Sequence, residues 1–138
     1  MSTRFIPPQT PTSEEYWAGA RRGELLYQVC SECGAHNFPP RAHCGTCGSS
    51  ELSWQTASGK GTVYTYTVSH RAPHPVFSDS CPLVIAVVEL EEGPRMMTNI
   101  VECDPESVSV GMSVQVTFEG IDDSEVVLPL FKPFDQAN

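Results

Sequence analysis

The stretch that decides the fold is Cys30-Ser-Glu-Cys33-Gly34, which is followed after ten residues, counted from Gly34, by Cys44-Gly-Thr-Cys47-Gly48. A Cys-x-x-Cys turn directs two sulfurs to a common point, and two such turns facing each other complete a tetrahedron. The glycine after each pair lets the chain adopt a positive φ, so that nearby backbone N–H groups turn toward the thiolates. The spacing therefore predicts one structural zinc ion on Cys30, Cys33, Cys44 and Cys47, with no position left for a reactive water.

Other interpretations of these cysteines are open at the level of the sequence. Four unrelated structural cysteines are one alternative, although the paired spacing and paired glycines argue against it. Iron would fit the same four thiolates, as in rubredoxins, where it carries electrons. We expect His36 and His43 at the surface, because four sulfurs already fill the tetrahedron, and we expect Cys81 and Cys103 to be free thiols near strand ends.

Composition limits the classes of partner. The 138 residues carry 8 basic and 17 acidic side chains, a formal net charge of −9 that repels phosphate backbones, so no nucleic-acid partner is expected. The longest apolar run, residues 82–88, is far shorter than the roughly 20 residues that span a bilayer, so no membrane partner is expected either. No basic and then apolar stretch opens the sequence, and we therefore expect a soluble protein in the reducing cytoplasm.

Three segments follow one another along the chain. We expect an N-terminal arm over residues 1–24, in which Thr12-Ser-Glu-Glu15 is typical of a capping box and Gly23 suits the residue after a helix that ends at Arg22. We expect the zinc ribbon over residues 25–57, with strand-like pieces at 26–29 and 36–38. In residues 58–138 we predict five strands, at residues 62–69, 83–90, 95–101, 114–118 and 126–131. Five strands with a long first loop and a hairpin between the second and third favour a small barrel of the OB-fold type.

Several motifs together resemble one widespread family, described as acyl-CoA-associated, that joins a rubredoxin-like zinc ribbon to an OB-fold. They are Leu25-Leu-Tyr-Gln-Val-Cys-Ser-Glu-Cys-Gly34, Phe38-Pro-Pro-Arg41, Ser58-Gly-Lys-Gly-Thr-Val-Tyr-Thr-Tyr-Thr-Val68, Val87-Val-Glu-Leu90 and Gly93-Pro-Arg95. The resemblance implies a mainly β protein with a short helical arm, the ribbon and then the barrel. It also implies an accessory subunit in lipid or acyl-CoA metabolism that binds a CoA thioester, a thiolase-like or enoyl-CoA hydratase-like enzyme, or both.

Three residues are candidates for contact with the CoA thioester or the partner enzyme. Arg71 and Phe77 belong to residues 70–82, the loop between the first two barrel strands, which lines the usual ligand face of an OB-fold. Arg41, which follows two prolines, is the third. Each has an ordinary alternative, since the loop can simply pack Phe77 on the barrel and Arg41 can pair with a local acid. At Tyr64 and Tyr66 we expect packing within the barrel.

No catalytic constellation stands out in the sequence. There is no nucleophile elbow and no phosphate-binding glycine loop, and Cys81 near His70 or His74 is the nearest thing to a nucleophile with a base. We therefore expect little or no turnover by the chain alone. Two other functions remain open: a nucleic-acid-binding module, because zinc ribbons and OB-folds often bind DNA or RNA, and a rubredoxin-like electron carrier. One feature argues against the nucleic-acid-binding module. The barrel loop that usually helps to grip a nucleic-acid strand would be negatively charged here, because it contains Asp122, Asp123 and Glu125.

Overall fold

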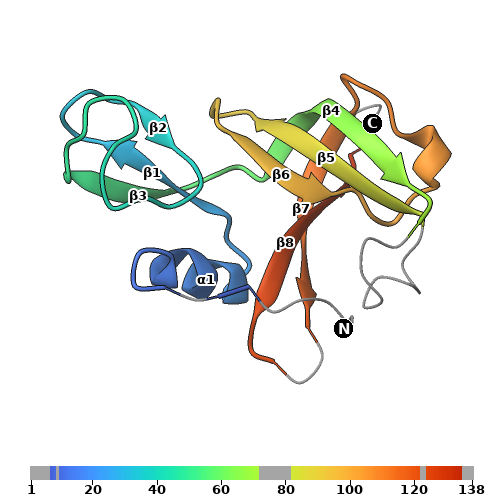
Figure 1. Ribbon diagram of the computed structural model, residues 1–138, viewed down its shortest axis with the longest axis horizontal. Coiled ribbons are helices and arrows are strands. Elements are labelled where there is room, and N and C mark those ends of the chain that lie inside the picture. The colour runs from blue at the N-terminus through green and yellow to red at the C-terminus, as the bar shows by residue number, and fades with distance from the viewer. Residues whose placement is uncertain (1–6, 9, 72–81, 122–123, 135–138) are drawn as a thin grey trace.

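The computed structural model describes residues 7–8, 10–71, 82–121 and 124–134 and is mainly β. Its one α-helix lies below a small three-stranded sheet, and a larger five-stranded sheet forms the other side of the molecule (Figure 1). The elements are α1 (Glu14–Arg21), β1 (Leu26–Cys30), β2 (His36–Asn37), β3 (Leu52–Thr56), β4 (Lys60–Ser69), β5 (Leu83–Leu90), β6 (Arg95–Asn99), the short 3-10 helix η2 (Pro105–Ser107), β7 (Ser113–Gly120) and β8 (Val127–Pro133).

The helix α1 ends as predicted but begins differently. Gly23 has φ +81° and its N–H donates to the carbonyl of Ala20, while the Glu24 N–H donates to the carbonyl of Gly19, which is the Schellman arrangement. The expected capping box at Thr12 is wrong, since the N-cap is Ser13 and no side chain caps the helix. The Ser13 hydroxyl instead bonds the Thr10 hydroxyl and backbone. Within the described residues, no helix is long and apolar enough to cross a membrane.

The small sheet has the order β2-β1-β3, with β1 antiparallel to both neighbours. The strands β1 and β2 correspond to the two predicted pieces, but β3 was not predicted. Three of its five residues are exposed, and its alternation of half-buried and exposed positions runs only from Leu52 to Gln55, which is too short to mark a strand by itself. The Ala57 N–H donates to the Leu25 carbonyl at 2.8 Å, which ties the end of this sheet to its beginning.

The five-stranded sheet has the order β6-β5-β4-β7-β8 and curls into a nearly closed barrel, the predicted OB-fold. A parallel bridge between Ile100 and Phe131 joins its two ends, where the Val101 N–H donates to the Phe131 carbonyl at 2.8 Å. β5 has the predicted bounds, because its continuous apolar run ends where the turn residues Glu91-Glu-Gly-Pro94 begin. The other four strands lie within two residues of the predicted positions at each end.

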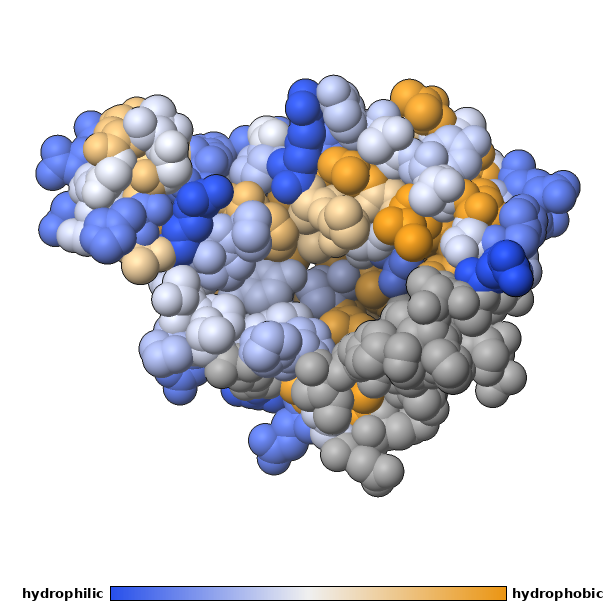
Figure 2. Space-filling view, viewed as in Figure 1, coloured by the Kyte–Doolittle hydropathy of each residue, from blue (hydrophilic) through white to orange (hydrophobic). Residues whose placement is uncertain are grey.

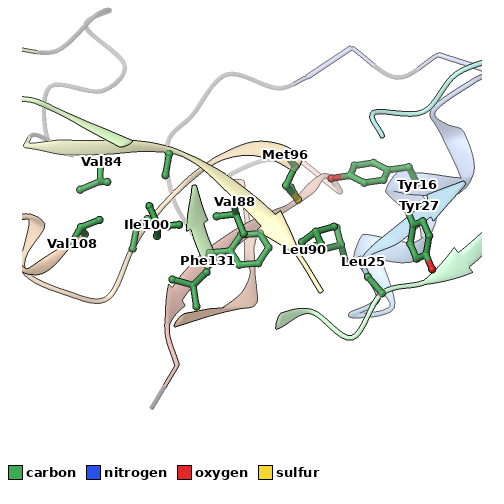
Figure 3. Packing of buried hydrophobic residues seen from close by; sticks show 14 residues of the cluster. Tyr16, Leu25, Tyr27, Val84, Val88, Leu90, Met96, Ile100, Val108 and Phe131 are labelled. Atoms are coloured by element: carbon green, nitrogen blue, oxygen red, sulfur yellow. The ribbon is translucent and has the colours of Figure 1, made fainter. Parts of the chain in front are cut away.

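One apolar core runs from the barrel into the arm and the ribbon. Val63, Val88, Val114 and Phe131 are almost fully buried inside the barrel. The same cluster includes Leu25 and Tyr27 of the ribbon and Tyr16 of the helix. Figure 3 shows the Tyr16 ring pointing from α1 toward Met96 of β6. A helix of eight residues is unstable by itself in water, so this packing on the barrel is what holds α1 in place.

The two tyrosines of β4 do not pack in the barrel, which corrects the expectation from the sequence. Tyr64 is 49% exposed and Tyr66 is 36% exposed. The pairing of β4 with β5 shifts between Val63 and Thr65, and this β-bulge breaks the alternation from which their inward position was inferred. The Arg95 guanidinium lies over the Tyr64 ring, 3.9 Å from its centroid, and also bonds Glu89 at 2.9 Å.

Candidate metal centre

The two cysteine pairs form two turns with the same hydrogen bonds. In the first, the Gly34 N–H donates to the Cys30 carbonyl at 2.8 Å, and the Cys30 N–H donates to the Ala35 carbonyl at 2.9 Å. In the second, the bonds from Gly48 to Cys44 and from Cys44 to Ser49 measure 2.9 and 2.8 Å. Gly34 and Gly48 have φ values of +79° and +78°, a region that a side chain would strain. The predicted role of both glycines is therefore confirmed.

The four sulfurs are positioned to hold one metal ion. All of them lie within 4.8 Å of one another. The Sγ atoms of Cys30 and Cys47 are 3.6 Å apart, and those of Cys33 and Cys44 are 3.7 Å apart. Sulfurs at about 2.3 Å from a tetrahedral zinc ion would lie about 3.8 Å from each other. The cage therefore fits one structural zinc ion, and four thiolate ligands leave no open coordination position for a water or substrate.

Backbone N–H groups favour the charged form of the two buried cysteines. The N–H of Cys47, and after it the N–H of Thr46, lower the pKa of Cys44 to about 6. The Thr46 nitrogen is 3.3 Å from the Cys44 sulfur. The pKa of Cys30 is lowered as well, chiefly by the N–H of Cys33. A metal ion binds the thiolate rather than the thiol, so these donors prepare both residues as ligands.

Two buried amide side chains support the cage, and the sequence analysis missed both. Asn37 donates to the Cys44 sulfur at 3.6 Å and accepts a bond from the Gly45 N–H at 2.9 Å. Gln28 accepts from the Arg41 N–H at 2.8 Å and donates to the Arg41 carbonyl at 3.0 Å, which fixes the backbone before the second turn. A buried amide in a short strand gives no pattern by which it could have been recognised.

The ribbon also contacts the β5–β6 turn of the barrel directly. The His36 Nδ1 is 2.8 Å from the Glu92 carbonyl, and this nitrogen is the donor because a carbonyl only accepts. In the linker between β3 and β4, the Ser58 N–H donates to the Glu92 carboxylate at 2.8 Å and its hydroxyl donates to Glu91 at 2.7 Å. His36 and His43 are exposed, as expected, but the His36 ring joins the two domains.

The structure does not bring the other candidate residues together. Arg41 is exposed in the ribbon, and its guanidinium lies beside Gly45. Arg71 is exposed just after β4, whose C-terminal end lies at the opposite end of the molecule from the ribbon (Figure 1). Phe77 lies outside the described residues, as do Cys81, His74, Asp122 and Asp123. Cys103 is half-buried and forms no disulfide with another described residue.

Comparison with family models matches both domains. The rubredoxin-like zinc ribbon domain of ChsH2 matches residues 17–53, and the C-terminal OB-fold domain of ChsH2 matches residues 54–119. The chain is 43% identical to a DUF35 domain-containing scaffold protein of Methanocaldococcus jannaschii, over 80% of this chain and 82% of that protein. It is 37% identical to a probable enoyl-CoA hydratase alpha subunit of Thermomonospora curvata, over 94% of this chain. The match spans only 45% of that subunit, so the chain covers less than half of its length.

A solved structure has the same two-domain architecture. The matching chain belongs to the Ltp2-ChsH2(DUF35) aldolase, is 36% identical and superposes with a TM-score of 0.82. The alignment covers 93% of this chain and 98% of that one, so it includes the arm, the ribbon and the barrel together.

Proposed function

This chain belongs to the DUF35 family, in which a zinc ribbon precedes an OB-fold, and we propose that it is the zinc-containing accessory subunit of an acyl-CoA-processing enzyme complex. The partner that we propose is an enzyme of the enoyl-CoA hydratase or aldolase type. The observation that carries this proposal is the similarity of nearly the whole chain to the matching chain of the Ltp2-ChsH2(DUF35) aldolase.

The names of the relatives support the same role. One is a hydratase alpha subunit, and another is a scaffold protein. A subunit and a scaffold both act as parts of assemblies, and the aldolase is named for two components. Family membership fixes the fold but not the function, so the choice of partner depends on experiment.

The chemistry of the described residues is consistent with an accessory role. The zinc cage is closed, and in the described part of the chain it is the one group of three or more His, Cys, Asp or Glu side chains positioned to hold a metal. A closed tetrathiolate site stabilises a fold and does not activate water. We therefore propose that turnover belongs to the partner enzyme.

The finer part of the proposal is that the subunit contacts the CoA thioester itself. Arg41, Arg71 and Phe77 are the residues that we propose for this role. Arg41 belongs to the ribbon and Arg71 follows β4, whose C-terminal end lies at the other end of the molecule from the ribbon (Figure 1), so each would act at a separate part of an extended ligand or at the partner's surface. A thiolase-like partner remains within the proposal, because thiolases act on the same class of thioester.

The decisive experiment measures turnover of an enoyl-CoA by the purified chain, by the enzyme that co-purifies with it, and by the two together. We expect none from the chain alone and a clear gain for the enzyme when the chain is added. Substitutions Arg41→Ala, Arg71→Ala and Phe77→Ala should weaken CoA binding by the complex and keep the zinc. Arg21→Ala, at an exposed arginine of α1, is the matched control. Robust turnover by the isolated chain, abolished by Cys81→Ser, would contradict the accessory role.

One observation keeps nucleic acid as a rival ligand. Exposed Tyr64 and Tyr66 lie on the first barrel strand, and aromatic side chains on OB-folds can stack on bases. The net charge of −9 opposes this, and Arg95 already covers one face of the Tyr64 ring. A titration with single-stranded DNA and RNA at physiological salt decides between them, and a micromolar complex that weakens with salt would favour the rival.

A further inference from the structure

An apolar groove lies where the arm, the ribbon and the barrel meet. Its volume is about 320 Å³, and the surface is hollowed between α1 and the barrel strands (Figure 2). The groove is lined by Pro8, Ser13, Tyr16, Trp17, Phe38, Pro39, Pro40, Met96 and Met97. The lining therefore comes from three parts of the chain that are far apart in sequence.

The groove has the composition of a protein-binding surface. None of its lining residues carries a charge, although 18% of the chain is charged. The Tyr16 ring makes edge contacts with Trp17 and Phe38, at centroid distances of 5.0 and 5.6 Å, so the three rings form one aromatic wall. Met97 on the rim is 73% exposed. Aromatic residues and methionine are enriched in the buried centres of protein interfaces.

The charge of the lining and of the whole chain limits which molecules can bind in the groove. A phosphate-bearing ligand would find no cation among the lining residues. A second copy of the chain would bring another net charge of −9 against the first, which disfavours self-association. Residues of both signs adjoin the lining in sequence, with Glu15 before Tyr16 and Arg41 after Pro40, and Glu15 pairs with Arg22 at 3.5 Å, so the border has no single sign. The net charge of −9 acts on an approaching protein as a whole and favours an apolar segment that is flanked by basic residues.

We propose that this groove, together with exposed Met97, is the surface on which the hydratase- or aldolase-type partner docks an apolar segment flanked by basic residues. This inference rests on the proposed function and assigns that function a place on the molecule. Because arm, ribbon and barrel all line the groove, a docked partner would hold the three parts together.

The test places a photo-cross-linking residue at position 97 of the full-length protein in its native host. The control carries the same residue at Val110, which is 67% exposed in the turn before β7 and does not line the groove. Mass spectrometry then identifies what is captured. Capture of a hydratase- or aldolase-type enzyme at position 97, and not at position 110, supports the proposal. Capture of the enzyme only at position 110 overturns the docking surface and leaves the proposed function intact.

Two further outcomes distinguish a wrong occupant of the groove from a wrong proposed function. Capture of a second copy of this chain at position 97 overturns the choice of occupant. Failure to capture such an enzyme at either position, with no such enzyme co-purifying, contradicts the proposed function itself.

Affinity measurements with the captured enzyme make the result quantitative. Met97→Asp should weaken its binding at least about tenfold, since a charge would enter an apolar contact. Met97→Leu, which keeps the apolar surface, should change the affinity by less than about threefold. Val110→Asp adds the same charge elsewhere and should have no effect, and all three variants should keep their zinc. Equal losses for Met97→Asp and Val110→Asp would overturn the proposal.

Discussion

The ribbon and the barrel are held together by different forces. The ribbon has three short strands, and the outer strand β3 is mostly exposed. Its four cysteines are positioned as a metal cage. The barrel has five strands of five to ten residues around almost fully buried Val88, Val114 and Phe131. A segment as small as the ribbon buries too little apolar surface to fold alone, whereas the barrel has a core of its own. One domain thus depends on a bound ion, and the other on apolar burial.

This difference predicts that each domain can be weakened separately. Zinc ligation contributes only in the ribbon, and a single core substitution acts first on the barrel. The shared contacts of Tyr16, Leu25 and Tyr27 with the barrel core limit how independent the two domains can be. Perturbing each domain in turn therefore measures both its own source of stability and the coupling between them.

The largest effect is expected from Cys33→Ser, at an exposed ligand of the cage. Structural zinc is worth on the order of 10 kcal/mol to a small zinc-binding domain, and three thiolates hold it far less well. Elemental analysis should find about one zinc ion per wild-type chain and little in the variant. Hydrogen exchange should then rise across residues 25–57 and stay low in β5 and β7.

Cys103→Ser serves as the control, because Cys103 lies outside the cage and should leave the zinc content unchanged. Full zinc retention by Cys33→Ser would show that the ligand set is wrong. Loss of protection in the barrel as well as in the ribbon would show that the two domains unfold as one unit.

The sequence predicted the metal cage better than the strands around it. Ligand spacing is set by the geometry of the ion, so two Cys-x-x-Cys pairs identify all four ligands without any knowledge of the fold. The strand β3 gives a weaker signal, because its alternation covers only four residues and its pairing with β1 cannot be read from the sequence. Asn37 and Gln28 were missed for a related reason: their hydrogen-bond partners lie in the segment around the second cysteine pair, which no local pattern connects to them.

In the barrel, the apolar run at β5 was enough to define a strand. In β4 the position of the strand was predicted, but the inward position of Tyr64 and Tyr66 was wrong. A bulge adds one residue to a strand and changes which side chains point inward. No pattern in the sequence of residues 60–69 predicts this bulge. The capping box failed because the N-cap is Ser13 and not Thr12, and the Ser13 hydroxyl bonds Thr10 in place of a helix N–H. Patterns predict where elements lie, but local hydrogen bonds and register decide their details.

The second prediction concerns the barrel core. Phe131→Ala should lower the free energy of unfolding by about 3 to 5 kcal/mol, because Phe131 is fully buried and its truncation leaves a cavity. That loss is a large share of a typical domain's stability. Urea unfolding followed by circular dichroism measures it. The zinc content should stay at one ion per folded chain, since all four ligands lie in the ribbon.

Phe131→Leu provides a milder companion in case the alanine variant does not fold. It keeps most of the apolar volume and should cost about 1 kcal/mol. If Phe131→Leu released the zinc, the ribbon would depend on the barrel core, and the separation between the two domains would be refuted.

The smallest effect tests the contact between the domains. Removing the His36 ring by His36→Ala deletes the hydrogen bond to the Glu92 carbonyl, a bond that is exposed and so should be worth about 1 kcal/mol or less. The β5–β6 turn also holds the linker through Ser58, so loosening should spread to residues 57–60 and to the Glu91 amide, which bonds the Lys60 carbonyl at 3.0 Å. Hydrogen exchange should rise at these amides and remain unchanged within β5 and β7. His43→Ala, at the other exposed histidine of the ribbon, is the matched control and should change neither the linker nor the turn. If the two variants behaved alike, the His36 contact would contribute nothing measurable, and the arrangement of the domains would rest on the apolar contacts of Tyr16, Leu25 and Tyr27.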